Sequence, residues 1–266
     1  MTTETPVRSA TINGVSLKYI DTGSGDSAIV FVHGWTCNRT DWRYQIEEFA
    51  RSHRVVALDQ RGHGDSDKPD QDYTIDGFAD DLAAFIAELG IERPVIVGHS
   101  MGGVIANSLA RRSPDIARAL VLVDAPIVPL SEALTGTVTT VLSGLQTPGY
   151  QDILRQFSEV FFFNEGTDPA TKEELMATTA EAPQRLIHTA LASLVEEAEK
   201  HSGPMPVPTL FLRAATNVSS ADEIKSRFPN IELAEIGGAH FLQLEHPAEV
   251  NSAIRGFIER LTEVPA

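Results

Sequence analysis

Short apolar runs alternate with stretches of helical periodicity over much of the chain. The continuous apolar runs cover residues 28–32, 55–58, 94–97, 119–123 and 207–212. Runs of this length without polar interruption are typical of strands that are buried on both faces of a parallel sheet. Between the second and third runs, apolar side chains recur at helical spacing, at Ile75, Phe78, Leu82, Phe85, Ile86 and Leu89. The alternation predicts an α/β fold with a mostly parallel central sheet and helices on both faces.

Both ends of the chain add to this predicted sheet. Strand-like residues 7–12 and 15–21 flank Asn13-Gly14, a pair that favours a two-residue hairpin because both central positions take positive φ. We therefore expect an antiparallel hairpin at one edge of the sheet. Residues 231–236 predict a last strand, and the helix after it has one apolar face, formed by Val250, Ile254, Phe257, Ile258 and Leu261.

The alternation stops after Asp124. Residues 125–205 contain no convincing strand, and their clearest helical stretches are residues 171–179 and 184–200. The sequence therefore predicts a core, residues 1–125 and 206–266, that is interrupted after its sixth strand by a helical cap over residues 126–205.

Composition narrows the range of partners. The chain has 266 residues with 37 acidic and 21 basic side chains, which gives a formal charge of −16. Nucleic acids and anionic membrane surfaces repel such a charge, and no apolar run is long enough to cross a bilayer. Cys37 is the one cysteine, and residues 1–10 show no secretory signal. We expect a cytoplasmic protein that acts on a small molecule and binds neither nucleic acid nor membrane, with a homodimer left open.

The strand at residues 94–97 leads into Gly98-His99-Ser100-Met101-Gly102, which has the pattern G-x-S-x-G. In an open parallel sheet, active sites lie beyond the carboxyl ends of the strands. A strand before the pattern and a predicted helix after it, residues 101–112, give it the setting of a nucleophile elbow, a tight turn that exposes a serine hydroxyl above the sheet. Ser100 is therefore the candidate nucleophile.

A serine hydroxyl needs a neighbouring base to take its proton. His240 follows the last predicted strand, in Gly237-Gly238-Ala239-His240, and is the best placed of the 8 histidines. His99 lies inside the elbow and His33 precedes a glycine turn, which suits supporting roles. The chain has no H-E-x-x-H motif, no cysteine pair that could bind zinc and no phosphate-binding loop.

Four segments together resemble the α/β-hydrolase family. They are His33-Gly34-Trp35 after the third strand, residues 59–66 after the fourth, residues 98–103 at the elbow and residues 237–240 near the end of the chain. The resemblance spans nearly the whole chain. It implies a Ser–His–acid triad, a lid formed by the cap, no metal and no organic cofactor. It also implies an oxyanion hole formed by the backbone N–H groups of Trp35 and Met101.

Candidate substrate contacts come from the same regions. Gly34, Trp35 and His99 belong to the loops beside the nucleophile, and Phe161 and Phe162 belong to an aromatic run in the cap. Two roles are open for this run: contact with an apolar substrate, or packing of the cap onto the core.

The acid of the implied triad departs from the commonest pattern of the family. There the acid follows the seventh strand in a segment that resembles P-x-L-x-x-x-G-x-x-D, whereas residues 208–217 place alanine at the glycine position and Asn217 at the acid position. An amide cannot stabilise an imidazolium by charge, and such an exchange costs roughly 10⁴ in rate. Asp124, at the end of the sixth strand, is therefore the expected acid, as in some members of the family. Asp222 and Glu223, which have the pattern of a helix start, are the weaker alternative.

The expected activity is hydrolysis of a small carboxylic ester through an acyl-enzyme on Ser100, with His240 as the base. Hydrolysis of lactones or of carbon–carbon bonds uses the same triad and stays open. The chain also resembles, more distantly, the cofactor-independent quinolone 2,4-dioxygenases, through Trp35 and Asp124. In that chemistry the histidine ionises a hydroxyl group of a 3-hydroxy-4-quinolone-like substrate. A third hypothesis, a non-enzymatic binding protein, rests on Asn217 alone.

Overall fold

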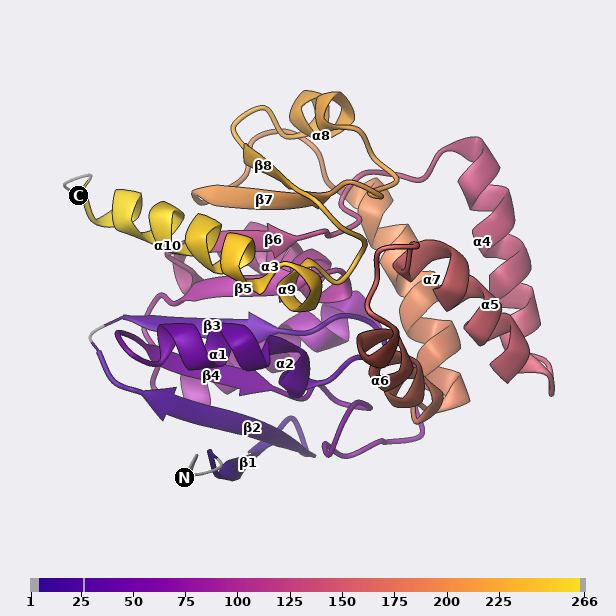
Figure 1. Cartoon of the computed structure of the whole chain (residues 1–266). Helices are drawn as coiled ribbons and strands as arrows, with labels where there is room; N and C mark the ends of the chain where they lie inside the picture. Colours follow the sequence, from indigo (N-terminus) through magenta and orange to yellow (C-terminus); the bar gives the residue numbers. More distant parts are fainter. Residues whose placement is uncertain (1–4, 26, 264–266) are drawn as a thin grey trace.

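Parallel strands form the centre of an eight-stranded sheet. The computed structural model describes residues 5–25 and 27–263 (Figure 1). The strands lie in the order β1-β2-β4-β3-β5-β6-β7-β8. The pairs β1·β2 and β2·β4 are antiparallel, and the strands from β3 to β8 are parallel. Their bounds are β1 (Val7–Ile12), β2 (Val15–Gly23), β3 (Ala28–Val32), β4 (Arg54–Leu58), β5 (Val95–His99), β6 (Ala119–Val123), β7 (Thr209–Ala214) and β8 (Glu232–Ile236).

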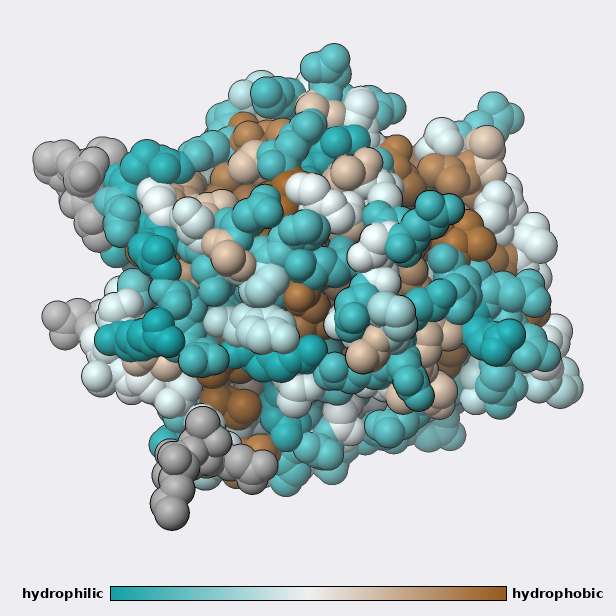
Figure 2. All heavy atoms as spheres, in the orientation of Figure 1, coloured by the Kyte–Doolittle hydropathy of each residue, from teal (hydrophilic) through white to brown (hydrophobic). Residues whose placement is uncertain are grey.

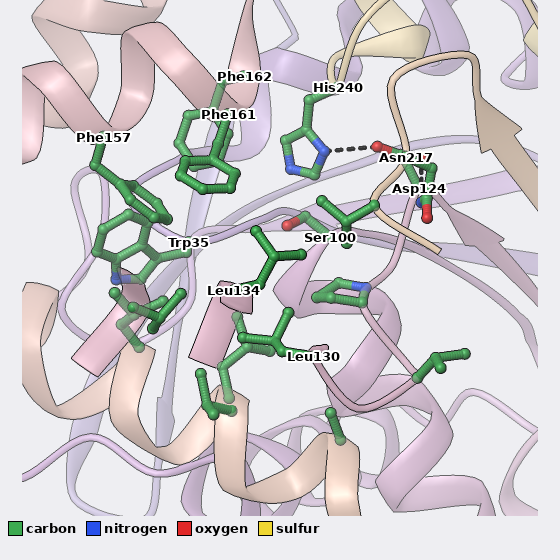
Figure 3. Close-up of a pocket in the computed structure, with 18 of the residues that line it drawn as sticks. Trp35, Ser100, Asp124, Leu130, Leu134, Phe157, Phe161, Phe162, Asn217 and His240 are labelled. Carbon is green, nitrogen blue, oxygen red and sulfur yellow. Dashed lines mark hydrogen bonds and ion pairs between the residues drawn. The ribbon is translucent and has the colours of Figure 1, made fainter. Parts of the chain in front are cut away.

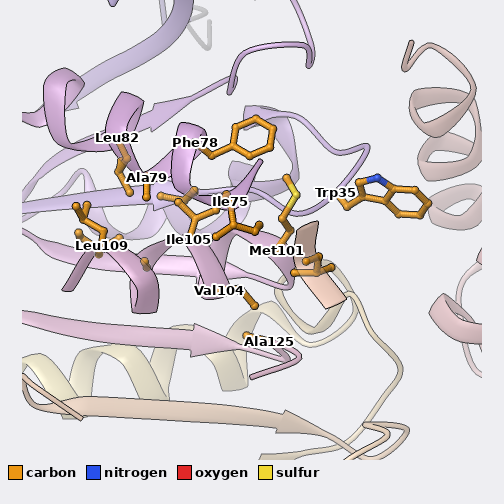
Figure 4. Packing of buried hydrophobic residues seen from close by; sticks show 14 of the residues in the cluster. Trp35, Ile75, Phe78, Ala79, Leu82, Met101, Val104, Ile105, Leu109 and Ala125 are labelled. Atoms are coloured by element: carbon orange, nitrogen blue, oxygen red, sulfur yellow. The ribbon is translucent and has the colours of Figure 1, made fainter. Parts of the chain in front are cut away.

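Helices cover both faces of the sheet because the side chains of a buried strand point alternately to either side. Val30 and Ile96 point to the face that α2 and α3 cover, and Figure 4 shows the packing of these two helices. Phe31 and Val97 point to the opposite face, which α1 and α10 cover. The bounds of the helices around the sheet are α1 (Arg43–Phe49), α2 (Ile75–Glu88), α3 (Met101–Arg112), α8 (Ala221–Arg227), α9 (Leu242–Glu245) and α10 (Pro247–Glu263).

Four helices between β6 and β7 form a helical insertion at the carboxyl ends of the parallel strands (Figure 1). They are α4 (Glu132–Leu145), α5 (Tyr150–Phe162), α6 (Pro169–Ala180) and α7 (Gln184–Lys200). Since the loops that follow β3, β5 and β6 end at the same edge, the insertion covers the part of the sheet where an active site is expected.

The two halves of the helical insertion are attached to the core differently. Polar contacts fix α6 and α7: Arg43 of the core binds Glu174 through two contacts of 3.0 Å, and the indole N–H of Trp35 donates to the carbonyl of Ile187 at 3.1 Å. Among the hydrogen bonds of the described residues, none joins α4 or α5 to the core. Their polar contacts are with the rest of the insertion: Lys172 of α6 pairs with Glu159 of α5, and Gln184 of α7 donates to the carbonyl of Leu145 at the end of α4. Against the core they pack through apolar and aromatic side chains.

Most predicted elements are confirmed, with shifts of a few residues at their ends. Asn13 and Gly14 both have positive φ, as the predicted hairpin requires. Between β3 and β4 the chain first forms a 3₁₀ turn at Arg39–Trp42 and then α1, which ends at Phe49. The sequence did not single out α4 or α5 within the insertion. No helix in the described part of the chain is long and apolar enough to span a membrane.

Candidate active site

Ser100 lies at the sharp turn between β5 and α3. Its backbone has φ of 51° and ψ of −120°, a region in which a non-glycine residue is strained by about 1–3 kcal/mol. A side chain at Gly98 would collide with the backbone of Gly102 and Gly103, and one at Gly102 would collide with the backbone of Val32 at the end of β3. The Ser100 amide donates to the carbonyl of Val123 at 2.9 Å, which ties the turn to the end of β6.

His240 and Asp124 form a hydrogen bond at the same edge of the sheet. The His240 Nδ1 atom lies 2.7 Å from Asp124 Oδ2, and the side chains are 14% and 3% exposed. Because an ionised carboxylate only accepts hydrogen bonds, Nδ1 carries the proton and Nε2 keeps its lone pair. Figure 3 shows this second nitrogen facing the pocket, on the side of Ser100. Asp124 also has a strained backbone, with φ of 47°.

Asn217 lies beside Asp124 and binds it. The second carboxylate oxygen, Oδ1, accepts from the Ala214 amide at 2.9 Å and from Asn217 Nδ2 at 2.6 Å. The Asn217 side-chain oxygen accepts from the Ser219 amide at 2.8 Å, so the amide group presents its NH₂ to Asp124. These donors hold one oxygen of Asp124 and leave the other for His240. Asp222 and Glu223, in contrast, are exposed in the first turn of α8.

The hydroxyl of Ser100 and Nε2 of His240 are not hydrogen-bonded to each other, although both face the pocket (Figure 3). Catalytic hydrogen bonds are often long in ligand-free enzymes and shorten when substrate binds. The arrangement therefore brings the candidate nucleophile and the candidate base to the same cavity.

Two backbone N–H groups near Ser100, those of Trp35 and Met101, have no hydrogen-bond acceptor among the described residues. The Trp35 loop is held by His33, whose Nδ1 donates to the Gly34 carbonyl at 2.8 Å and whose Nε2 accepts from the Gln60 amide at 3.0 Å. Burial lowers the pKa of His33 to about 4, so it is neutral when it makes these contacts.

The cavity above Ser100 is almost entirely apolar. It has an empty volume of about 870 Å³, including the part that is open to solvent. One wall is aromatic and the other is aliphatic, formed mainly by Leu130, Leu134, Val138, Leu191, Leu194 and Val195. Apart from the three candidate catalytic side chains, its polar lining is Thr216, Asn217 and the indole of Trp35. Figure 2 shows apolar side chains at the surface beside α4, the helix that carries Leu134.

The predicted substrate contacts fall into two groups. Trp35, Phe161 and Phe162 line the cavity. Gly34 and His99 instead lie behind its wall: a Cβ atom at Gly34 would be 2.9 Å from His99 Nδ1. The aliphatic wall from α4 and α7 was not foreseen, because nothing in an amphipathic helix indicates which neighbour its apolar face meets.

His99 supports the loop that carries His240. Its Nε2 donates to the backbone carbonyl of His240 at 2.9 Å, and the two imidazole rings pack with centroids 4.7 Å apart. His99 Nδ1 is buried without a hydrogen-bond partner. Burial holds the pKa of His99 well below its usual range, so the ring stays neutral. Within residues 5–25 and 27–263, no three His, Cys, Asp or Glu side chains gather to hold a metal ion.

Comparisons with known proteins agree with this architecture. The model of the family described as "Alpha/beta hydrolase family" matches residues 29–253. Epoxide hydrolase 1 of Caenorhabditis elegans is 37% identical over 42% of this chain, a span that covers 28% of that protein. Epoxide hydrolase 3 of Xenopus tropicalis is 29% identical over 93% of this chain and 76% of its own length. The structure of a thermophilic esterase from Thermogutta terrifontis superposes with a TM-score of 0.81 at 26% identity, covering 96% of this chain and 99% of that one.

The buried histidines around the site predict that stability falls in mild acid. Burial lowers the pKa of His33, His63 and His99, so the unfolded chain takes up protons below pH 6.5 that the folded chain does not. Each contributes up to about 1.4 kcal/mol of lost stability per pH unit. Two buried carboxyl groups offset part of this loss. Burial raises the pKa of Asp41 to about 6 and also raises the pKa of Asp59, so the folded chain takes up these protons at a higher pH than the unfolded chain does.

Urea unfolding at two pH values measures the net change in the free energy of unfolding. We expect the free energy of unfolding to be about 2 kcal/mol lower at about pH 5.5 than at about pH 7.5. A free energy that is equal or higher at the lower pH would contradict the assignment of these histidines as neutral.

Proposed function

The chain belongs to the α/β-hydrolase family, and we propose that it hydrolyses small, uncharged carboxylic esters with Ser100 as nucleophile and His240 as base. Asp124 is the acid of the proposed triad. The observation that carries the proposal is the 2.7 Å hydrogen bond between His240 and Asp124. This bond fixes the imidazole as the tautomer that can take the serine proton.

The proposed reaction uses each of these groups in turn. His240 Nε2 takes the proton of the Ser100 hydroxyl while the oxygen attacks the ester carbonyl. The negative charge that develops on the carbonyl oxygen is stabilised by the free backbone N–H groups of Trp35 and Met101. His240 then returns the proton to the leaving alcohol, and the same steps with water release the acid. Asp124 stabilises the imidazolium in both halves of the reaction.

The lining of the cavity favours an uncharged ester over an epoxide. Opening an epoxide places negative charge on the ring oxygen, which then needs an acid beside it. The described residues that line the cavity include no tyrosine, lysine or arginine. Apart from His240 and its partner Asp124, none of them is a side chain of the kinds that serve as general acids. A substrate carboxylate would also have no cation to pair with, and burying an unpaired charge is costly. A lactone, which is a cyclic ester, fits the same site.

A second candidate is a cofactor-independent dioxygenase of a 3-hydroxy-4-quinolone-like substrate. The observation that favours it is that Nε2 of His240 makes no hydrogen bond to Ser100. This nitrogen is therefore free to take a proton from a substrate hydroxyl instead. In that reaction the substrate anion reacts with dioxygen, and Ser100 has no nucleophilic role.

Substitutions in the proposed triad separate these two functions. With p-nitrophenyl butyrate, we expect Ser100→Ala and His240→Ala to lower kcat by at least about 10³ and Asp124→Asn by about 10⁴. The exposed Asp222→Asn variant is the control and should keep full activity. Full activity in Asp124→Asn would refute Asp124 as the acid. Oxygen uptake with a 3-hydroxy-4-quinolone that survives in Ser100→Ala would instead support the dioxygenase.

The apolar cavity predicts discrimination against negative charge on the substrate. We expect kcat/KM for p-nitrophenyl butyrate to exceed that for the mono-p-nitrophenyl ester of succinic acid by about 100-fold or more, because the second carboxylate is buried unpaired. Leu134→Lys, which adds a cation to the cavity wall, should reduce this ratio. Equal kcat/KM values for the two esters in the unsubstituted protein would contradict the proposed substrate class.

A further inference from the structure

One face of the His240 ring is covered by a side chain of the helical insertion. Phe162, the last residue of α5, stacks on His240 with ring centroids 4.9 Å apart and an interplanar angle of 14°. His99 lies 4.7 Å from the imidazole at 51°, and Phe241 lies 5.5 Å from it at 79°. The imidazole is therefore held among three rings, and one of the three comes from outside the core.

The position of the Phe162 ring depends on how α5 is seated. Its edge contacts are with Trp35 at 6.3 Å, Phe157 at 5.7 Å and Phe241 at 5.9 Å between centroids. No hydrogen bond of the described residues joins α5 to the core. The polar contact of α5 is with α6, through Glu159 and Lys172. A displacement of α5 away from the core would therefore remove Phe162 from His240 without breaking a hydrogen bond to the core among the described residues.

We propose that Phe162 is a positioning residue for His240, an inference that rests on the proposed function of the site. The stacked ring keeps Nδ1 directed at Asp124 and Nε2 directed into the pocket (Figure 3). When the Ser100 proton moves to His240, the ring becomes cationic, and the π face of Phe162 stabilises that charge. The base is then fully competent only while α5 is seated over the site.

The neighbouring Phe161 offers a matched comparison. Its ring stacks on Phe157, with centroids 4.6 Å apart at 29°, and it has no ring contact with His240 among the described residues. Both phenylalanines line the cavity. A change at Phe161 therefore alters the wall that a substrate meets, whereas a change at Phe162 also alters the base.

The test compares Phe162→Leu, Phe162→Tyr and Phe161→Leu in two measurements. With p-nitrophenyl butyrate, Phe162→Leu should lower kcat by about 5- to 30-fold, the range expected for loss of a desolvated cation–π contact. Phe162→Tyr keeps an aromatic ring at this position. Its kcat should therefore stay within about twofold of that of the unsubstituted protein. Phe161→Leu should change KM more than kcat.

The second measurement does not depend on catalysis. The pKa of His240 is read from an NMR titration of protein labelled with ¹⁵N-histidine, with the signal assigned from His240→Ala. Leucine keeps the ring covered but removes the π face, so Phe162→Leu should lower this pKa, and Phe161→Leu should leave it unchanged. If the protein proves inactive on esters, this titration still tests the stacking.

Two results would overturn the proposal. One is an unchanged His240 pKa in Phe162→Leu, whatever happens to kcat. The other is a kcat that falls as far in Phe162→Tyr as in Phe162→Leu, with thermal unfolding showing that both variants are folded. A lowered pKa together with rescue by tyrosine supports it.

Discussion

The hydrogen bond between Asp124 and His240 is the contact on which the rest of the site depends. It joins the end of β6 to the loop after β8, and it exists because β6 lies between the elbow strand β5 and β7. The Ala214 amide at the end of β7 and the amide group of Asn217 occupy the other oxygen of Asp124. Because β6 and β7 are neighbours in the sheet, an acid after β6 can reach the same histidine as an acid in the commoner position after β7.

The helical insertion gives this polar pair an apolar surrounding. Helices α4, α5 and α7 supply about half of the residues that line the cavity, all of them apolar, so a substrate leaves water as it approaches Ser100. The insertion also reaches the base itself through Phe162. Helices α6 and α7 are fixed to the core by polar contacts such as Arg43 with Glu174. Helices α4 and α5 pack on the core through apolar and aromatic side chains, and their polar contacts are with α6 and α7. The cavity wall and the surroundings of His240 thus depend in part on the two helices that make no hydrogen bond to the core among the described residues.

Local sequence patterns were enough to predict the sheet, the elbow at Ser100 and the positions of His240 and Asp124 at the strand ends. Continuous apolar strands and glycines at tight turns are dictated by neighbouring residues, so they can be read without a structure. The stacking of Phe162 on His240 and the donor role of Asn217 could not be, since each joins segments that are distant in the chain. Helix α4 was not predicted because threonine and glycine residues interrupt the helical spacing of its apolar side chains.

The direct test of the central claim is whether Asp124 holds the Nδ1 proton of His240. A proton shared between imidazole and carboxylate gives a low-field NMR signal, which ¹⁵N-histidine labelling assigns to a ring. We expect the unsubstituted protein and Asn217→Leu to show this signal for His240 and Asp124→Ala to lack it. A signal that persists unchanged in Asp124→Ala would show that another acceptor orients His240.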